Sequence, residues 1–345
     1  MSVRTGKSVR LRDIAAELGV SVITVSNVLR DRGRVSSQMR ERVLKLAKEL
    51  NYHPDLTARS LATGRTHLVG MVVPDLLHPF FAAIGKAIAA HLRERGYSLV
   101  LCSSDEDAVI ELQEVESLLA RRIDALVLAT VQRAKSSRVF GLLQKASVPY
   151  VLLDRQIPGL KAPFIGSGDR RIGELATEHL IARGYKRIAH IGLLGPRTGA
   201  GRLDGYTATL KQHACTVDPK YVVLVESADD RGEDCGHRAM KKLIGVEPRP
   251  DAVFCYNDII ASGAQKALLE AGLKIPEDTA LIGVSNLAGL CLWNSFQVPI
   301  TSVDQNVSRL AALTASAILE MQDRNAPVAP KRVYVPPRIV VRDST

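Results

Sequence analysis

The fold of the amino-terminal part is decided by residues 9–29, which read VRLRDIAAELGVSVITVSNVL. Apolar residues recur at helical spacing in its first half, and Gly19 ends that helix. Ser21 is positioned to cap a second helix, whose apolar side begins at Val25. Two short helices joined by a turn that contains glycine are typical of a helix-turn-helix unit.

A third helix is expected to complete this unit. Ser36 is positioned to cap it, and Val43, Leu46, Ala47 and Leu50 recur at the spacing of one inward face. The sequence therefore predicts three short helices around a small core.

The boundaries of this unit follow from its flanking residues. Pro54 prevents the third helix from continuing, so we expect a helix-turn-helix domain at 9–54. Residues 1–8 are polar and are expected to form a disordered tail. Residues 55–65 are expected to form a short hinge helix and a linker.

Positive charge is concentrated at this end of the chain. Residues 1–65 contain 13 Lys and Arg but 6 Asp and Glu, a net charge of +7, whereas the whole chain carries +10. A basic module on a nearly neutral body indicates that one end meets phosphate. Several arginines suit phosphate contacts, although each alone is also compatible with a solvated surface charge: Arg10, Arg12, Arg30, Arg32 and Arg34.

The amino-terminal part of the second helix, residues 21–27, is expected to face base edges in a major groove. Val22 and Ile23 have two interpretations there: they pack on thymine methyl groups, or they belong to the core. Leu61 likewise either forms an apolar wedge in a minor groove or packs on the body of the chain.

Composition excludes several classes of protein. A chain of 345 residues with 46% apolar and 24% charged residues is expected to be a globular protein of two or three domains. The five cysteines are scattered and form no CxxC pair, which favours free thiols in a reducing compartment. The sequence has no apolar signal region and no run of 18 apolar residues, so we expect a cytoplasmic protein without a membrane segment.

After Thr66 the pattern alternates between strand and helix, which predicts doubly wound parallel sheets. The number of strands favours two α/β lobes, which bind ligands at the carboxyl ends of their strands. This core, residues 66–345, is expected to divide into a first lobe at 66–169 and 301–330 and a second at 170–300 and 331–345. Strands are expected at 68–73, 97–102, 125–129, 150–153, 188–191, 222–225, 252–255 and 280–284, and helices at 80–95, 112–121, 140–146, 172–183, 202–213, 233–244 and 259–271.

Catalytic and cofactor motifs are missing. Residues 199–205 miss a dinucleotide-binding fingerprint by one residue, and no P-loop, HExxH or GxSxG occurs. The eight histidines form no cluster with the spacing of metal ligands. We therefore expect neither an enzyme nor a bound cofactor or metal.

The chain resembles the transcription regulators of the lactose-repressor and galactose-repressor (LacI/GalR) family over essentially its full length. The motifs that carry the resemblance are Asp13-Ile14-Ala15, Gly19-Val20-Ser21, Thr24-Val25-Ser26, Asn51-Tyr52-His53-Pro54, Ala58-Arg59-Ser60-Leu61, Asn257-Asp258, residues 272–278 (GLKIPED) and residues 337–342 (PRIVVR).

This resemblance implies an allosteric, sequence-specific repressor. It implies a homodimer on a near-palindromic DNA operator, with recognition helices in major grooves and paired hinge helices in the central minor groove. It also implies a small polar effector, such as a sugar or sugar acid, bound between two lobes of periplasmic-binding-protein type. No heptad tail follows Arg342, so a dimer is expected instead of a tetramer linked by its tails.

The resemblance and the patterns above together nominate two sets of residues. The DNA-contacting set is Arg10, Arg12, Ser21, Val22, Ile23, Thr24, Ser26, Asn27, Arg34, Ser36, Tyr52, Ala58 and Leu61. The effector-contacting set is Phe80, Phe81, Asp154, Arg197, Thr198, Arg202, Asn257, Ser285 and Gln305.

Two departures from the family pattern are informative. Arg10 stands where the family usually has a capping Thr, which removes a cap worth about 1 kcal/mol. Val284-Ser285 stands where the family usually has an Asp that grips ligand hydroxyls. The loss of that negative charge puts a neutral sugar in doubt and favours an acidic ligand.

The alternative function from another class is an enzyme or a transport-type binding protein built on the same lobes.

Overall fold

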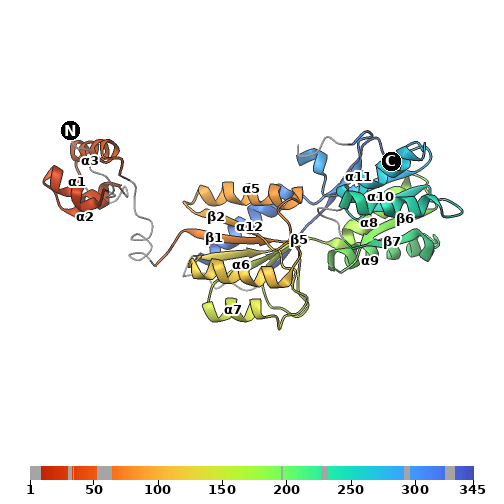
Figure 1. Ribbon diagram of the computed structural model, residues 1–345, viewed down its shortest axis with the longest axis horizontal. Helices are drawn as coiled ribbons and strands as arrows, with labels where there is room; N and C mark the ends of the chain where they lie inside the picture. Colours follow the sequence, from red (N-terminus) through yellow and green to blue (C-terminus); the bar gives the residue numbers. More distant parts are fainter. Residues whose placement is uncertain are drawn as a thin grey trace. The chain divides into compact units, whose positions relative to one another are not determined.

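The chain forms two units, residues 1–66 and 67–345, in the computed structural model (Figure 1). Only the backbone is described at Arg197 and Leu290. The structure describes residues 9–29, 33, 35–52, 64–195, 197–226, 232–290, 296–322 and 331–345.

Within its described part, the first unit consists of three helices: α1 (Leu11–Leu18), α2 (Val22–Leu29) and α3 (Ser37–Glu49). Their inward faces share one small core. It is formed by Ile14, Ala15, Val25, Val28, Val43 and Ala47. The predicted three-helix unit is thereby confirmed.

Side-chain caps explain where two of these helices begin. Ser21 Oγ accepts a hydrogen bond from the backbone N–H of Thr24 at 3.0 Å, and Ser36 Oγ accepts one from Met39 at 3.3 Å. Gly19 ends α1 in the left-handed region, with φ of 64°. Both caps and the glycine stop agree with the sequence-based prediction.

Two details of the three-helix unit differ from the sequence-based prediction. The backbone N–H of Arg10 donates to Asp13 Oδ2 at 2.8 Å, so an acidic side chain satisfies part of this helix end although Arg10 replaces a capping Thr. Leu50 does not face inward: it follows the last residue of α3, Glu49, and is 36% exposed. The helix ends one residue too early to carry Leu50 into the core.

Several predictions lie outside the described residues. They concern the tail at 1–8, the hinge helix within 55–65, and the side chains of Arg30, Arg32, Arg34, Ala58 and Leu61.

The second unit contains two lobes, each built on a sheet. In the first lobe all strand pairs are parallel. In spatial order its described strands are β11 (Arg332–Val335), β5 (Phe164–Ser167), β4 (Tyr150–Leu153), β3 (Ala125–Leu128), β1 (Leu68–Val73) and β2 (Ser98–Ser103).

The second lobe repeats this architecture with one antiparallel pair, β10 with β12. In spatial order its described strands are β12 (Arg338–Val340), β10 (Thr301–Asp304), β9 (Ala280–Val284), β8 (Ala252–Cys255), β6 (Ile188–Leu193) and β7 (Val222–Val225).

Helices cover both faces of each sheet, which is why the central strands are apolar along their whole length (Figure 1). The first sheet lies between α5 (Pro79–Arg93) with α12 (Val307–Gln322) and α6 (Ala108–Ala120) with α7 (Arg138–Ala146). The second sheet is covered by α8 (Asp169–Ala182), α9 (Arg197–Gln212), α10 (Gly232–Ile244) and α11 (Asp258–Glu270). The predicted fold class, a helical head with two doubly wound lobes, is confirmed.

Strand pairing corrects two of the predicted lobe boundaries. β10 pairs with β9 in the second sheet, although 301–330 was assigned to the first lobe. β11 pairs with β5 in the first sheet, although 331–345 was assigned to the second lobe. The chain therefore crosses between the lobes after β5, β10 and β11. A strand of four residues has too little periodicity to indicate which sheet it joins.

Candidate functional site

The outer surface of α2 begins with two exposed apolar side chains. Val22 is 44% exposed and Ile23 is 71% exposed, whereas Val25 is fully buried. The structure therefore excludes a core role for the first two. The hydroxyls of Ser21 and Thr24 lie 2.9 Å apart beside them. An exposed apolar pair flanked by hydroxyl groups provides contacts for both thymine methyl groups and polar base edges.

The other described residues of the predicted DNA-contacting set surround this surface or support it. Arg10 and Arg12 are exposed, as is Ser36, whose hydroxyl caps α3. Tyr52 is half-buried and packs against the helical core. Ser26 and Asn27 are half-buried on α2.

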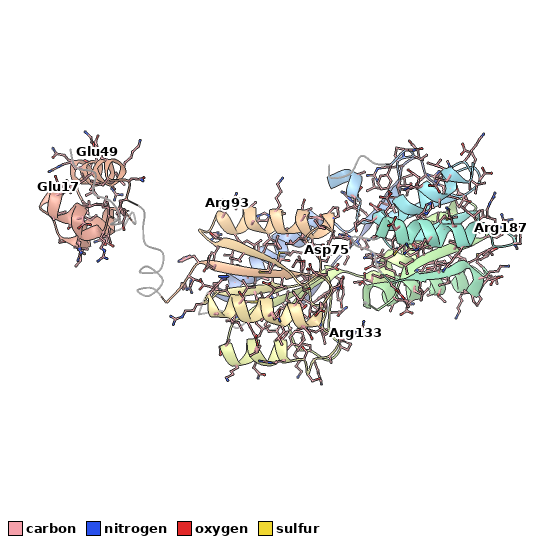
Figure 2. The ribbon with its side chains drawn as sticks, viewed as in Figure 1. Glu17, Glu49, Asp75, Arg93, Arg133 and Arg187 are labelled. Atoms are coloured by element: carbon pink, nitrogen blue, oxygen red, sulfur yellow. The ribbon has the colours of Figure 1, made fainter. Side chains whose placement is uncertain are left out.

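A second constellation lies between the two lobes, where strand ends from both sheets face each other. Figure 2 shows Asp75 and Arg133 in this region, whereas Arg93 and Arg187 lie on outer surfaces. We call its narrow part the inner pocket. It is lined by His78, Phe80, Phe81, Asp154, Arg155, Leu193, Arg202, Tyr256, Asn257, Ser285 and Gln305.

The inner pocket brings together seven residues of the predicted effector set. They are Phe80, Phe81, Asp154, Arg202, Asn257, Ser285 and Gln305. Thr198 lies behind the lining, with its Oγ1 2.8 Å from Tyr256 Oη. Of Arg197 only the backbone is described. Sequence reasoning missed His78, Arg155, Leu193 and Tyr256, which belong to no quoted motif.

Arg202 is the cation at the base of the inner pocket, and it is only 3% exposed. Its Nη1 donates to the carbonyl oxygen of Tyr256 at 2.6 Å, and its guanidinium lies 4.3 Å from the centre of the Tyr256 ring. Its Nε donates to Asp169 Oδ1 at 3.3 Å. Asp169 was not predicted, because it belongs to the first turn of α8 and meets Arg202 only when α8 packs on α9.

Glycines allow that packing. A Cβ built on Gly173 of α8 would lie 2.2 Å from the carbonyl oxygen of Arg202. One built on Gly205 of α9 would lie 2.1 Å from that of Arg170. The two helix backbones therefore touch, which holds Arg202 against Asp169.

A hydrogen-bonded chain crosses between the lobes. Gln305 Nε2 donates to Asp154 Oδ1 at 3.4 Å, and Ser285 Oγ donates to Gln305 Oε1 at 3.3 Å. Gln305 directly follows β10, where the chain passes from the second lobe to the first. Its side chain thus links the two lobes at a crossing point.

Two polar side chains, His78 and Asn257, meet across the cleft. His78 Nδ1 accepts from the backbone N–H of Phe80 at 3.2 Å, and His78 Nε2 lies 3.2 Å from Asn257 Nδ2. Asn257 Oδ1 accepts from Ile260 N–H at 2.9 Å, which directs the Asn257 NH₂ group at the ring. A neutral imidazole has one donor and one acceptor nitrogen, so the two ring nitrogens play different roles in these contacts.

Burial sets the protonation of this region. Desolvation, with the charge of Arg155 nearby, lowers the pKa of His78 to about 4, so the ring is neutral at pH 7. Desolvation raises the pKa of Asp154, and it raises the pKa of Asp169 to about 7 although Arg202 opposes the shift. Asp154, which lines the inner pocket, and Asp169, which contacts Arg202, therefore both lose their protons reluctantly.

The loop after β9 is strained where it reaches the inner pocket. Ser285 and Asn286 have φ of 99° and 50°, a region that non-glycine residues rarely adopt. Buried Asp258 holds this loop, because its carboxylate accepts from Leu287 N–H at 2.8 Å and from Ser302 Oγ at 2.7 Å. Strain that the surroundings maintain in this way clusters at functional sites.

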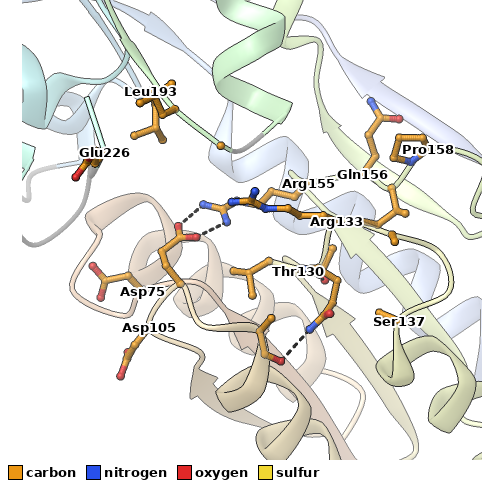
Figure 3. Close-up of a pocket in the computed structure, with 18 of the residues that line it drawn as sticks. Asp75, Asp105, Thr130, Arg133, Ser137, Arg155, Gln156, Pro158, Leu193 and Glu226 are labelled. Atoms are coloured by element: carbon orange, nitrogen blue, oxygen red, sulfur yellow. Dashed lines mark hydrogen bonds and ion pairs between the residues drawn. The ribbon is translucent and has the colours of Figure 1, made fainter. Parts of the chain in front are cut away.

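A wider compartment, which we call the outer pocket, adjoins the inner one (Figure 3). Its volume is about 1110 Å³, close to the upper range for small-molecule sites. Arg155 and Leu193 line both compartments. Most of its lining comes from the loops after β1, β2, β3 and β4, and it includes none of the predicted effector residues whose side chains the structure describes.

Two further observations concern the described part of the chain. Within the described ranges, no group of three or more His, Cys, Asp or Glu side chains is arranged to hold a metal ion. Nor does any helix described there have the length and apolar character needed to cross a membrane.

Two family models match the chain. The model for bacterial regulatory proteins of the lacI family matches residues 10–55. The model for periplasmic binding proteins and the sugar binding domain of the LacI family matches residues 66–328.

Individual proteins agree with these matches. A ribose operon repressor from Halalkalibacterium halodurans is 31% identical over 336 residues, which cover 97% of this chain and 96% of the relative. The transcriptional repressor PurR of Haemophilus influenzae is 32% identical over 338 residues, which cover 97% and 98%. The structure of the Lac repressor dimer bound to operator and the anti-inducer ONPF matches with a TM-score of 0.82 and 25% identity, covering 98% of this chain and 99% of that one. The chain therefore belongs to the LacI family: it is a DNA-binding transcriptional repressor, not an enzyme, whose core is a two-lobed sugar-binding domain.

Proposed function

We propose that this protein is a cytoplasmic homodimeric repressor that binds a near-palindromic operator and is controlled by a neutral, polyhydroxylated metabolite. The observation that carries the proposal is the inner pocket. Carboxyl, carboxamide and guanidinium groups converge there beside the rings of Phe80 and Phe81, which lie 5.2 Å apart. Aromatic faces with a few convergent polar groups suit a sugar-like molecule.

The charge balance favours a neutral ligand. The guanidinium of Arg202 is already matched by Asp169, and Asp154 supplies another carboxyl group. These two acids compensate for the missing Asp at Ser285, on which the expectation of an acidic ligand rested. Both carboxyl groups hydrogen-bond to ligand hydroxyls whether or not they carry a proton, and neither offers an anion a positive partner.

Effector binding requires the pocket to change shape. The inner pocket encloses about 30 Å³, enough for one or two waters but not for a sugar ring. A ligand hydroxyl placed between His78 and Asn257 would offer these side chains both a donor and an acceptor. A ligand that binds only the rearranged cleft shifts the balance between two lobe arrangements by its differential affinity.

The helical unit supplies the DNA contacts in this proposal. Val22 and Ile23 at the start of α2 read base edges, and Arg10 and Arg12 contact phosphate. Two copies related by a two-fold axis would place two such helices in successive major grooves, and the operator would share that symmetry. Analytical ultracentrifugation tests the dimer directly.

The DNA-contacting surface is tested by substituting Ile23→Ala in the full chain. Ile23 is 71% exposed, so the variant is expected to fold normally and to bind its promoter fragment about tenfold more weakly, as for the loss of one good base contact. Leu44→Ala is the matched control, because Leu44 is an exposed apolar residue (48%) on α3. Equal affinity of the two variants in fluorescence anisotropy would contradict the assignment of α2.

The effector pocket is tested by Asn257→Asp. This change keeps an acceptor for the Ile260 N–H, so the cap of α11 is retained, but it removes the NH₂ donor that faces His78. After a thermal-shift screen of neutral sugars identifies an effector, the variant is expected to lose its response while its operator affinity stays unchanged. An unaltered response would refute the role of Asn257.

A further inference from the structure

We infer that Glu106 determines the charge selectivity of the cleft: it occupies the guanidinium of Arg155 and thereby excludes anionic ligands from the outer pocket. The inference deepens the proposed function, on which it rests for the use of the cleft as the effector site. Glu106 would be a specificity-determining residue, and it belongs to neither the predicted effector set nor the lining of the inner pocket.

The pair that carries this inference is bidentate. Arg155 Nη1 donates to Glu106 Oε2 at 2.8 Å, and Nη2 donates to Oε1 of the same carboxylate (Figure 3). The Arg155 side chain is only 11% exposed, whereas that of Glu106 is 36% exposed. A nearly buried guanidinium in this fork geometry has both terminal nitrogens engaged by one carboxylate.

The backbone that presents Glu106 is held in an unfavourable conformation. Asp105 and Glu106 both adopt the left-handed region, with φ of 49° and 58°. Ser103 Oγ donates to Asp105 Oδ1 at 2.6 Å, and the Glu106 N–H donates to the carbonyl oxygen of Pro74 at 3.0 Å, which keeps the turn in place. Strained backbone of this kind concentrates at ligand sites.

The position of Arg155 makes this pairing consequential. Arg155 lines both compartments, so any ligand that extends from one to the other passes it. Its Nε is buried and has no hydrogen-bond partner among the described residues. A guanidinium whose two terminal nitrogens are unengaged and face a cleft is a ready site for carboxylate or phosphate. Glu106 removes that capacity.

No other described residue of the outer pocket provides a second buried guanidinium that could bind an anion. Among the described residues that line this pocket, Arg133 is the other cationic one, and it is exposed. Asp75, Asp105 and Glu226 add three more acidic side chains to the same lining. Acids thus outnumber bases among the described lining residues, which favours a neutral polyhydroxylated ligand over sugar acids or phosphates.

The test uses the full-length chain and simple anions. Wild type, Glu106→Gln, Asp105→Asn and the double variant Glu106→Gln/Arg155→Gln are titrated with sodium sulfate and inorganic phosphate by thermal shift and calorimetry. Sodium chloride at the same ionic strength is the reference, because it reproduces screening alone. The basic helical unit is identical in all four proteins, so its own anion binding cancels in the comparison.

We expect Glu106→Gln to bind sulfate and phosphate on the order of tenfold more tightly than wild type, the effect of one freed charge-assisted contact. Asp105→Asn removes one negative charge from the same turn, and Asn tolerates its left-handed backbone, but it frees no guanidinium. It should therefore show little gain. The double variant should return to the wild-type affinity.

Three results would overturn the inference: no gain in Glu106→Gln, an equal gain in Asp105→Asn, or a gain that persists in the double variant. If Glu106→Gln does not fold, Glu106→Asp is measured instead. It keeps the charge but shortens the side chain, so a smaller gain is expected, and no gain would overturn the inference. None of these titrations needs the effector or DNA, so failure here is distinct from failure of the proposed function.

Discussion

Gly205 of α9 allows a test of how the fold positions Arg202. A Cβ at this position would lie 2.1 Å from the carbonyl oxygen of Arg170, whereas ordinary contact begins at 3.4 Å. The obstacle is backbone, so no rotation of a side chain can relieve it. Gly205→Ala must therefore push α8 and α9 apart by about 1 Å.

The expected cost follows from two opposing effects. Overpacking lowers the free energy of unfolding by up to about 3 kcal/mol, and replacing a helical glycine by alanine raises it by about 1 kcal/mol. We expect a net loss of about 2 kcal/mol in the free energy of unfolding, together with a weaker effector response because Arg202 moves relative to Asp169. Gly141→Ala is the matched control: Gly141 lies on α7, and a Cβ there meets nothing within 4 Å.

The assay is urea unfolding of the full-length variants, followed by circular dichroism. Gly141→Ala is expected to be about 0.5–1 kcal/mol more stable than wild type, because alanine loses less backbone entropy in a helix. The reasoning would be refuted if Gly205→Ala proved as stable as Gly141→Ala. It would also be refuted if Gly205→Ala lost stability but kept the full effector response.

Two further predictions concern the second lobe. Burial raises the pKa of Asp258 to about 7. Between pH 4 and 7 the folded protein therefore retains a proton that the unfolded chain releases. The contribution of Asp258 to the free energy of unfolding falls as the pH rises through that window. Asp258→Asn should flatten that slope in urea midpoints measured at pH 5, 6 and 7, and an unchanged slope would argue against it. Ser285→Gly should relieve the backbone strain at φ of 99° and stabilise the fold by about 1 kcal/mol. It should also weaken the effector response, because the hydroxyl that contacts Gln305 is lost. A destabilised variant in the same assay would show that the loop is not strained.

The strained residues of the cleft share a feature that links these predictions. Asp105, Glu106, Asp154, Ser285 and Asn286 all have positive φ, and they follow the carboxyl ends of strands in both sheets. Each one turns the chain sharply where a polar side chain is presented between the lobes. The free energy stored in these turns is supplied by the well-packed sheets behind them.

Local chemistry was sufficient to predict much of this protein. The caps at Ser21 and Ser36, the stop at Gly19 and the apolar periodicity of the helices depend on residues within one or two turns of each other. Seven of the nine predicted effector residues line the inner pocket, and these were nominated by the family resemblance.

Only the tertiary structure decided which distant groups became partners. Glu106 and Arg155 are 49 positions apart, and Asp169 and Arg202 are 33 apart, so no periodicity in the sequence relates them. The same holds for the crossings that place β10 and β11 in opposite sheets. Sequence patterns report the face that a residue turns toward the core, whereas the charge of a cleft depends on which side chains the packed lobes bring within hydrogen-bonding distance.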